Sequence, residues 1–320
     1  MATLAKTVVA TGASSGLGFE LIKQLLTHPS PRDDHESRYR FIVGARDVAR
    51  TQAAYDALQE QYDAAARHSL TVLPLELSDL AATRSFAQQT LQRLAESESE
   101  SESGAAAGLD YLLLNAAVSG GREAVWVQGE KGRGGVDGWC EGVVVNHFSQ
   151  HYLMHLLKEK LVESKGRVVV VSSGAVRNVK DTDSLERDLK AGASEDARLL
   201  YAQTKFVQLL GAHWWRRQLK GQATVVAVSP GLIPGTGIGR GSGMKLTMDM
   251  PDAKPVSEGA QSILRAFTRD DLPEDPEQIF LTSWGEWWNK DVYGLTLDRA
   301  LQDKWCPSKE VMEQEAGLSG

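Results

Sequence analysis

The sequence is poor in the features that mark secreted, metal-stapled or membrane-spanning proteins. Its 320 residues contain two cysteines, Cys140 and Cys306, which are far apart and lack the spacing of a zinc site. This argues against a disulfide framework or a structural metal and favours a reducing compartment. No apolar run approaches the ~18 residues of a membrane span, and the first residues lack the apolar core of a signal peptide. We therefore expect a cytoplasmic protein without a membrane span.

Positive charge is scarce as well. The chain has 35 Lys and Arg against 42 Asp and Glu, a net charge of −7, which argues against nucleic acid or an anionic membrane as its main partner. A hydrophobic share of 42% is ordinary for a globular protein with a large core. The expected partner is a small molecule, and the oligomeric state stays open between monomer and homodimer.

Short apolar runs alternate with amphipathic stretches along the chain. The runs predict buried strands at 7–11, 41–45, 70–75, 111–117, 167–173 and 223–229. The stretches predict helices over 16–27, 48–66, 79–95, 139–162, 198–219 and 257–269. The alternation predicts an α/β fold, a single doubly wound Rossmann-type parallel sheet with helices on both faces. The carboxyl ends of its strands then share one edge, where ligands bind.

We assign residues 1–320 to one domain that carries several insertions. An acidic segment at about 96–108 predicts a solvated loop, and a glycine-rich segment at 118–138 predicts a mobile surface loop. A polar insertion at 177–198 is either a lid over the substrate or decoration, and we take the lid as the hypothesis to test. Residues 232–320 form the expected substrate loop and C-terminal helical extension.

A glycine-rich turn follows the first predicted strand. Gly12, Gly16 and Gly18 stand in TGASSGLG, between a buried strand and an amphipathic helix. A pyrophosphate needs such a turn, because the backbone must approach it closely with amide groups and a helix N-terminus facing its charge. A turn that serves packing alone is the alternative.

The second predicted strand ends in FIVGARD, with Arg46 at its tip. An acid at this point binds ribose hydroxyls, whereas an arginine accommodates a 2′-phosphate. Arg46 therefore favours NADP(H) over NAD(H), unless it is only an exposed residue at a helix start.

Polar residues also stand where later strands end, and a tyrosine and a lysine share one helix face. Tyr201 and Lys205 are four positions apart, so they lie one above the other on a helix. Taken alone, this is most often an amphipathic tyrosine and a snorkelling lysine at a core edge. Asn146 and Ser173 have equally ordinary explanations as a helix asparagine that satisfies backbone and a strand-end cap.

Together these residues resemble the short-chain dehydrogenase/reductase family over about residues 7–236. TGASSGLG matches the family's TGxxxGxG, LNAA at 114–117 stands where NNAG is usual, and Tyr201 and Lys205 supply YxxxK. Pro230–Gly231 with Thr236 matches the loop beside the nicotinamide. The long gap before Tyr201 and the segments PGLIPGTGIGR and SWGEWWNK are similar to the retinol-dehydrogenase-like and protochlorophyllide-reductase-like branch. Leu232 replaces the cysteine common in the latter, which favours dark carbonyl reduction.

The resemblance implies a mechanism and a set of site residues. Tyr201 would protonate the carbonyl oxygen of a ketone or aldehyde, Lys205 would tune the phenol and bind ribose, Ser173 would hold the oxygen, and Asn146 would support a relay water. The implied cofactor is NADP(H). Its expected contacts are Gly12, Ser14, Ser15, Gly16, Leu17, Gly18, Arg46, Glu76, Leu77, Asn115, Ala116, Tyr201, Lys205, Pro230, Gly231 and Thr236.

Two clusters of side chains and two rival functions remain open at this point. Trp284, Trp287 and Trp288 either line a site for an apolar, aromatic or polycyclic substrate or anchor the last helix. His147, His151 and His155 recur every fourth residue, but no carboxylate or cysteine accompanies them, so a helix surface or interface is favoured over a metal. The rivals to a reductase are an isomerase, dehydratase or cyclase on the same site and a non-catalytic NADP(H) sensor.

Overall fold

A seven-stranded parallel sheet forms the centre of the computed structural model, with the strand order β3-β2-β1-β4-β7-β8-β9. The structure describes residues 5–27, 38–64, 68–100, 108–120, 124–126, 138–193, 196–239 and 246–318, without the side chains of 98–100 and 124–126. The strands are β1 (Lys6–Thr11), β2 (Tyr39–Ala45), β3 (Ser69–Pro74), β4 (Tyr111–Leu114), β7 (Arg167–Val171), β8 (Thr224–Val228) and β9 (Phe280–Leu281). This confirms the Rossmann-type sheet. The two-residue strand β9 was not predicted from the sequence.

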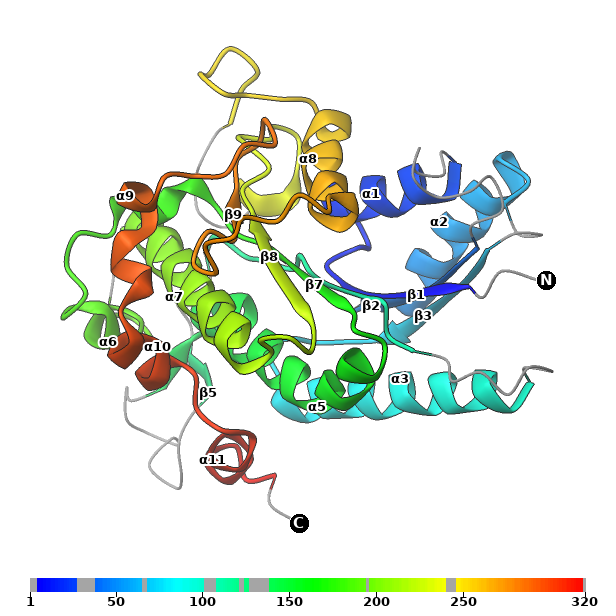
Figure 1. Ribbon diagram of the computed structural model, residues 1–320, viewed down its shortest axis with the longest axis horizontal. Coiled ribbons are helices and arrows are strands. Elements are labelled where there is room, and N and C mark those ends of the chain that lie inside the picture. The colour runs from blue at the N-terminus through cyan, green and yellow to red at the C-terminus, as the bar shows by residue number, and fades with distance from the viewer. Residues whose placement is uncertain are drawn as a thin grey trace.

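Helices cover both faces of the sheet (Figure 1). One layer consists of α1 (Gly16–Thr27), α2 (Val48–Gln61) and α8 (Val256–Thr268), and the other of α3 (Leu80–Glu100), α5 (Ser149–Glu163) and α7 (Ala197–Gln218). The apolar strand runs are buried because each layer packs its own core cluster against the sheet. Short helices complete the fold: α4 (Glu141–Val143), α6 (Leu185–Asp188), α9 (Lys290–Tyr293), α10 (Arg299–Trp305) and α11 (Lys309–Glu315).

The strand register brings the predicted site segments to one edge. Thr11 of β1 is level with Leu114 of β4, and Val171 of β7 is level with Val228 of β8. The chain therefore leaves all four strands at nearly the same height, with the glycine turn beside residues 115–117 and Ser172 beside Ser229.

Two insertions differ from their prediction as loops. Helix α3 continues to Glu100, so the acidic segment begins as helix, and 101–107 lie outside the described residues. Glutamate is a good helix former, which lets the helix continue where composition alone indicated a loop. In the glycine-rich segment, β5 (Ala124–Trp126) pairs with β6 (Trp139–Cys140) in an antiparallel ribbon, and 121–123 and 127–137 lie outside the described residues.

The insertion at 177–198 packs into the fold. Its Leu185 and Leu189 are both 0% exposed, and Asp188 accepts a 2.8 Å hydrogen bond from Gln203 of α7. Leu185 and Leu189 are four positions apart and so lie on one face of a helical turn. Because most residues of this segment are polar, the sequence did not identify the two leucines as buried. The segment forms a packed wall beside α7, and whether it also closes over substrate stays a prediction.

Candidate active site

The glycine turn closes tightly against the end of β4. Gly12 has φ +63°, and a Cβ there would lie 2.5 Å from Cα of Ala116. A Cβ on Gly18 would lie 2.6 Å from both Nδ2 of Asn115 and the carbonyl oxygen of Gly12. Side chains at either position would therefore push the turn off β4. Helix α1 begins at Gly16, so its free amide groups face the space beside this turn.

Asn115 and Thr11 fix the other side of the turn. The Asn115 amide donates to the carbonyl oxygen of Gly12 at 2.7 Å. The Thr11 hydroxyl accepts from the backbone amides of Asn115 at 3.1 Å and Ala116 at 3.2 Å. Gln150 of α5 then donates to the carbonyl oxygen of Ala116 at 2.9 Å. Thr11 and Gln150 were not predicted as site residues. The sequence features that could have indicated them are that Thr11 precedes Gly12 and that Gln150 lies one helical turn after Asn146.

Asn146 sits in a π-helical turn, Val144–Phe148, between α4 and α5. Its side chain accepts from the amide of Val118 at 2.8 Å and donates to the carbonyl of Val118 at 2.8 Å and to the Thr204 hydroxyl at 2.9 Å. The buried amide thus joins the segment after β4 to the tyrosine-bearing helix. Such π turns often mark functional positions, because they re-aim a side chain within a helix.

Ser173 ends the segment after β7 and caps a 3₁₀ turn, Gly174–Asn178. Its hydroxyl accepts from the amide of Ala175 at 3.1 Å. The same hydroxyl lowers the pKa of Tyr201, which places it beside the phenol. The sequence prediction that Ser173 and Tyr201 come together is consistent with this geometry.

Lys205 is a charged side chain that is almost entirely buried, with 1% of its surface exposed. Its ammonium donates to the carbonyl oxygen of Val171 at 2.8 Å and to Oε1 of Gln208 at 3.1 Å, and it lies 6.0 Å from the Tyr201 ring centroid. Burial lowers the pKa of Lys205 to about 7. The two acceptors offset part of the cost of burying the charge.

Burial acts on Tyr201 in the opposite direction. It raises the pKa of the phenol to about 12, and the smaller effect of Ser173 lowers it. The phenol is therefore protonated at neutral pH, as a proton donor must be. In the protein alone, burial outweighs the effect of Ser173. That Lys205 and an oxidised nicotinamide stabilise the phenolate stays a prediction.

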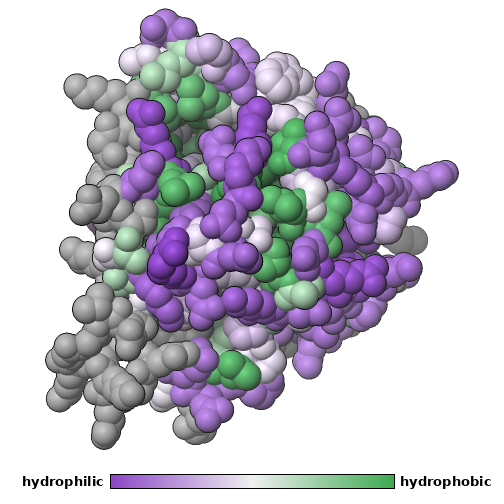
Figure 2. All heavy atoms as spheres, turned by 90° about the vertical axis from the view of Figure 1, so that its left-hand side faces the viewer, coloured by the Kyte–Doolittle hydropathy of each residue, from purple (hydrophilic) through white to green (hydrophobic). Residues whose placement is uncertain are grey.

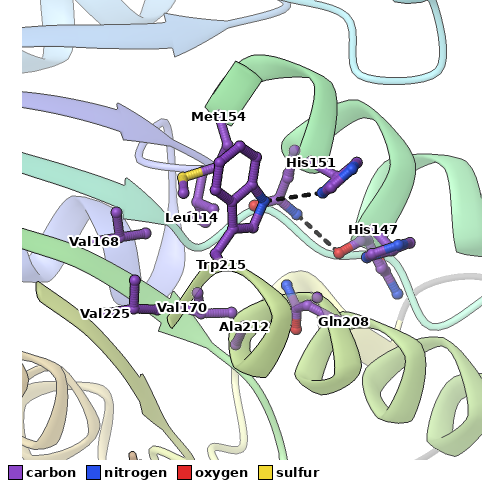
Figure 3. A pocket seen from close by; sticks show the side chains of 13 residues that line it. Leu114, His147, His151, Met154, Val168, Val170, Gln208, Ala212, Trp215 and Val225 are labelled. Carbon is purple, nitrogen blue, oxygen red and sulfur yellow. Dashed lines mark hydrogen bonds between the residues drawn. The ribbon is translucent and has the colours of Figure 1, made fainter. Parts of the chain in front are cut away.

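Gln208 connects Lys205 to an internal cavity between the sheet and helices α5 and α7 (Figure 3). The cavity is about 20 Å³ in volume and has room for one water molecule. Its polar lining residues are Asn146, His147, Gln150, His151 and Gln208, and the others are mostly apolar. Nε2 of Gln208 is buried and has no hydrogen-bond partner among the described residues. The sequence did not single out Gln208, although it lies one turn after Lys205.

The loop after β8 returns over the glycine turn. Gly231 has φ +94°, and the methyl group of Thr236 lies 3.6 Å from the position of a Cβ on Gly16. The Thr236 hydroxyl donates to the carbonyl of Ile233 at 3.0 Å. Pro230, Gly231 and Thr236 thus reach the same edge as Gly16, as the sequence predicted, while 240–245 lie outside the described residues.

The remaining predicted cofactor contacts lie around this edge with different exposures. Arg46, Ser14 and Ser15 are exposed, Leu17 is half-buried, and Asp47 caps α2 by accepting from Arg50 at 3.0 Å. Glu76 accepts from the amide of Ser78 at 3.1 Å. Leu77 is buried, and its carbonyl accepts from the Ser149 hydroxyl at 2.5 Å.

The three histidines bind the C-terminal extension. His147 and His151 are buried, and their Nε2 atoms lie 2.7 Å from the carbonyl of Trp305 and 2.9 Å from that of Pro307. The Trp215 indole donates to Nδ1 of His151 at 2.9 Å (Figure 3). Of the two predicted alternatives, a helix surface and an interface, the exposed helix surface does not apply to these two residues, because the extension covers them. Within the described residues no group of three potential metal ligands occurs.

The tail tryptophans divide between the two core faces. Trp288 packs against the cluster around α7, Trp287 packs against the cluster around α8, and Trp284 is 57% exposed. Two of the three therefore do anchor the segment after β9. Both cysteines are buried and free, and in the described parts of the chain no helix is long and apolar enough to cross a membrane.

Comparisons with known proteins agree with this geometry, although no family model matches the chain. A short-chain dehydrogenase/reductase of Pestalotiopsis microspora is 54% identical over 315 residues, 98% of this chain and 99% of that protein. Retinol dehydrogenase 14 of Mus musculus is 30% identical over 323 residues, 96% of this chain and 85% of that protein.

Solved structures share the fold at low sequence identity. An alcohol dehydrogenase from Thermococcus sibiricus, complexed with 5-hydroxy-NADP, has a TM-score of 0.56 and 16% identity, over 87% of this chain and 96% of that chain. A short-chain dehydrogenase from Sphingobium yanoikuyae in complex with NADPH has a TM-score of 0.54 and 18% identity, over 87% of both chains. With a near full-length relative at 54% identity, the chain belongs to the short-chain dehydrogenase/reductase family, nearest its retinol-dehydrogenase-like branch.

Proposed function

We propose that the protein is an NADPH-dependent reductase of a ketone or aldehyde. The observation that supports the proposal best is the buried ammonium of Lys205, 6.0 Å from the centroid of the Tyr201 ring, with Ser173 as the other polar group that acts on the phenol. A protonated phenol flanked by a hydrogen-bonding hydroxyl and a cation is suited to donate a proton to a carbonyl oxygen that gains negative charge.

The residues around the glycine turn fit a dinucleotide. The turn has glycine at the two positions, Gly12 and Gly18, where a Cβ atom would collide with Ala116 or Asn115. Helix α1 begins at this turn and directs its free amide groups toward it. Arg46 is exposed beyond β2, where its guanidinium could bind a 2′-phosphate. Lys205 would hold the nicotinamide ribose. Bound NADPH would supply the hydride. The NADP(H) complexes of the two solved structures above support this choice.

The chain's own residues would then move one proton. The Tyr201 hydroxyl gives its proton to the carbonyl oxygen, which the Ser173 hydroxyl orients. Lys205 stabilises the resulting phenolate by its charge. Asn146 and Gln208 line the cavity next to Lys205, and a water there would allow the phenol to be reprotonated.

A screen of NADPH consumption tests the proposal. The panel contains aromatic, steroid-like and polyketide ketones, and each hit is checked for one NADPH oxidised per alcohol formed. A product formed without net NADPH oxidation would instead identify an isomerase, dehydratase or cyclase. NADPH binding without turnover of any panel member would favour the sensor.

A further inference from the structure

Arg177 is an exposed residue four positions after Ser173. It belongs to the 3₁₀ turn that Ser173 caps, and its Nε donates to the carbonyl oxygen of Gly174 at 2.8 Å. Its guanidinium carbon lies 5.1 Å from the ring centroid of Trp288. A backbone acceptor and an aromatic face therefore fix the side chain, while its terminal nitrogens stay available.

The guanidinium packs against Gly174, the residue that follows Ser173. A Cβ on Gly174, the residue after Ser173, would lie 2.8 Å from Nη2 of Arg177 and 3.5 Å from Cζ2 of Trp288. The 3₁₀ turn also packs directly on α7, which carries Tyr201. A molecule whose carbonyl reaches Ser173 would thus have Arg177 within reach of its other groups.

Two cations in the C-terminal part of the chain are paired with carboxylates, whereas Arg177 is not. Arg269 stacks on Trp287 in a similar way but pairs with Asp271, and Lys290 pairs with both Asp275 and Glu277. Among the residues that the structure describes, no carboxylate lies within ion-pair distance of Arg177. An arginine that is held in place without an acidic partner has terminal donors suited to a carboxylate or another anion.

We infer that the substrate carries an acidic group, a carboxylate or an ionised phenol, on the same molecule as its carbonyl, and that Arg177 binds this group. The inference rests on the proposed function, since Ser173 defines where the carbonyl lies. The face that carries α6, α9 and α10 shows separate small apolar patches among hydrophilic side chains where it is coloured (Figures 1 and 2). This mixture suits a substrate with an apolar body and a charged end.

Matched acid and ester probes test the inference. The probes are 4-formylbenzoate, 4-hydroxybenzaldehyde at a pH where the phenol is ionised, and methyl 4-formylbenzoate as the neutral partner. Binding to the NADPH complex is measured by calorimetry, and kcat/KM by NADPH oxidation. Arg177→Met removes the charge but keeps an apolar chain over Trp288. Arg177→Lys keeps the charge but loses the planar fork. Arg198→Ala on α7 removes an equally exposed arginine as the control.

We expect the wild type to prefer the acids, and the acid-to-ester ratio to fall about tenfold in Arg177→Met. That factor lies between a weak exposed ion pair and a full charge-assisted hydrogen bond. Arg177→Lys should keep part of the preference, Arg198→Ala all of it, and high salt should weaken it. Absence of any acid preference in the wild type, or an unchanged ratio in Arg177→Met, overturns the inference. Acid-selective binding without NADPH oxidation would instead reject the reductase and leave the anion site in place.

Discussion

The ammonium of Lys205 and the side-chain oxygen of Gln208 form a buried 3.1 Å hydrogen bond, one turn apart on α7. The glutamine thereby solvates a charge that burial disfavours, and its free Nε2 lies next to the cavity. Gln208 is a positioning residue for Lys205, because it contacts the ammonium and no reacting atom.

Removing this acceptor should alter the pH dependence of cofactor binding. Lys205 has a pKa of about 7, so NADPH affinity should fall as the pH rises through 7 and the ammonium loses its proton. Gln208→Leu deprives the charged form of a hydrogen bond, so the fall should begin about half to one pH unit lower. Titrations of NADPH from pH 5.5 to 9 measure the pH at which the affinity begins to fall in each variant. Gln218→Leu, at an exposed position of the same helix, is the control, and identical profiles for both variants would contradict the expectation.

Tyr201→Phe tests the proton donor. It removes one hydroxyl and little volume, so folding and NADPH binding should persist while the reduction rate falls ~10²–10⁴-fold. Single-turnover NADPH oxidation with a confirmed ketone, at equal cofactor occupancy, measures the rate. Tyr62→Phe, at a tyrosine that is 43% exposed, should match the wild type. A Tyr201→Phe enzyme with more than about a tenth of the wild-type rate would remove the phenol from the mechanism.

Arg46→Ala tests the cofactor preference. The wild type should bind NADPH more tightly than NADH, and the variant should lose about tenfold in NADPH affinity with little change for NADH, as expected for one charge-assisted phosphate contact. Fluorescence titration of both cofactors gives the ratio. Arg50→Ala removes an exposed arginine one turn later and should leave the ratio unchanged. Equal wild-type affinities for the two cofactors would rule out the assignment of Arg46.

Gly18→Ala tests the close approach of the glycine turn to β4. The new Cβ would meet Nδ2 of Asn115 and the Gly12 carbonyl at 2.6 Å, so we expect a loss of about 1–3 kcal/mol in the free energy of unfolding and weaker NADPH binding. Gly294→Ala is the matched control, because its Cβ would have no heavy atom within 4 Å. Urea unfolding and NADPH titration report the two effects. Equal stability of both variants would show that the turn relaxes freely.

The histidine contacts predict that stability falls in mild acid. Burial lowers the pKa of His147 to about 4, below its ordinary value of 6.5, so the unfolded chain binds more protons than the folded protein between these pH values. Stability should therefore rise with pH from about 4 to 6.5, with His147 contributing about 3 kcal/mol over that range. Urea unfolding at pH 5 and 7.5 measures the slope. His147→Gln should reduce the slope without abolishing it, because burial also lowers the pKa of His151, His155 and His213. A slope equal to that of the wild type would assign the effect to these other histidines.

The sequence by itself determined the sheet and the glycine turn at its edge. Apolar runs such as 41–45 are buried on both faces in any parallel sheet, and Gly12 and Gly18 are required wherever the backbone turns this tightly. Tyr201 and Lys205 share a helix face by spacing alone. These features are local, so a linear pattern reveals them.

The tertiary structure decided what depends on contacts between distant segments. Gln208 accepts a hydrogen bond from Lys205, and His147 contacts the Trp305 carbonyl oxygen. Both contacts depend on packing that excludes water from these side chains. The same packing raised the pKa of Tyr201. In the sequence Arg177 is one arginine among many. Only the tertiary structure places it over the ring of Trp288, a residue 111 positions later in the chain. Burial and long-range contact set these properties, and no spacing along the chain encodes them.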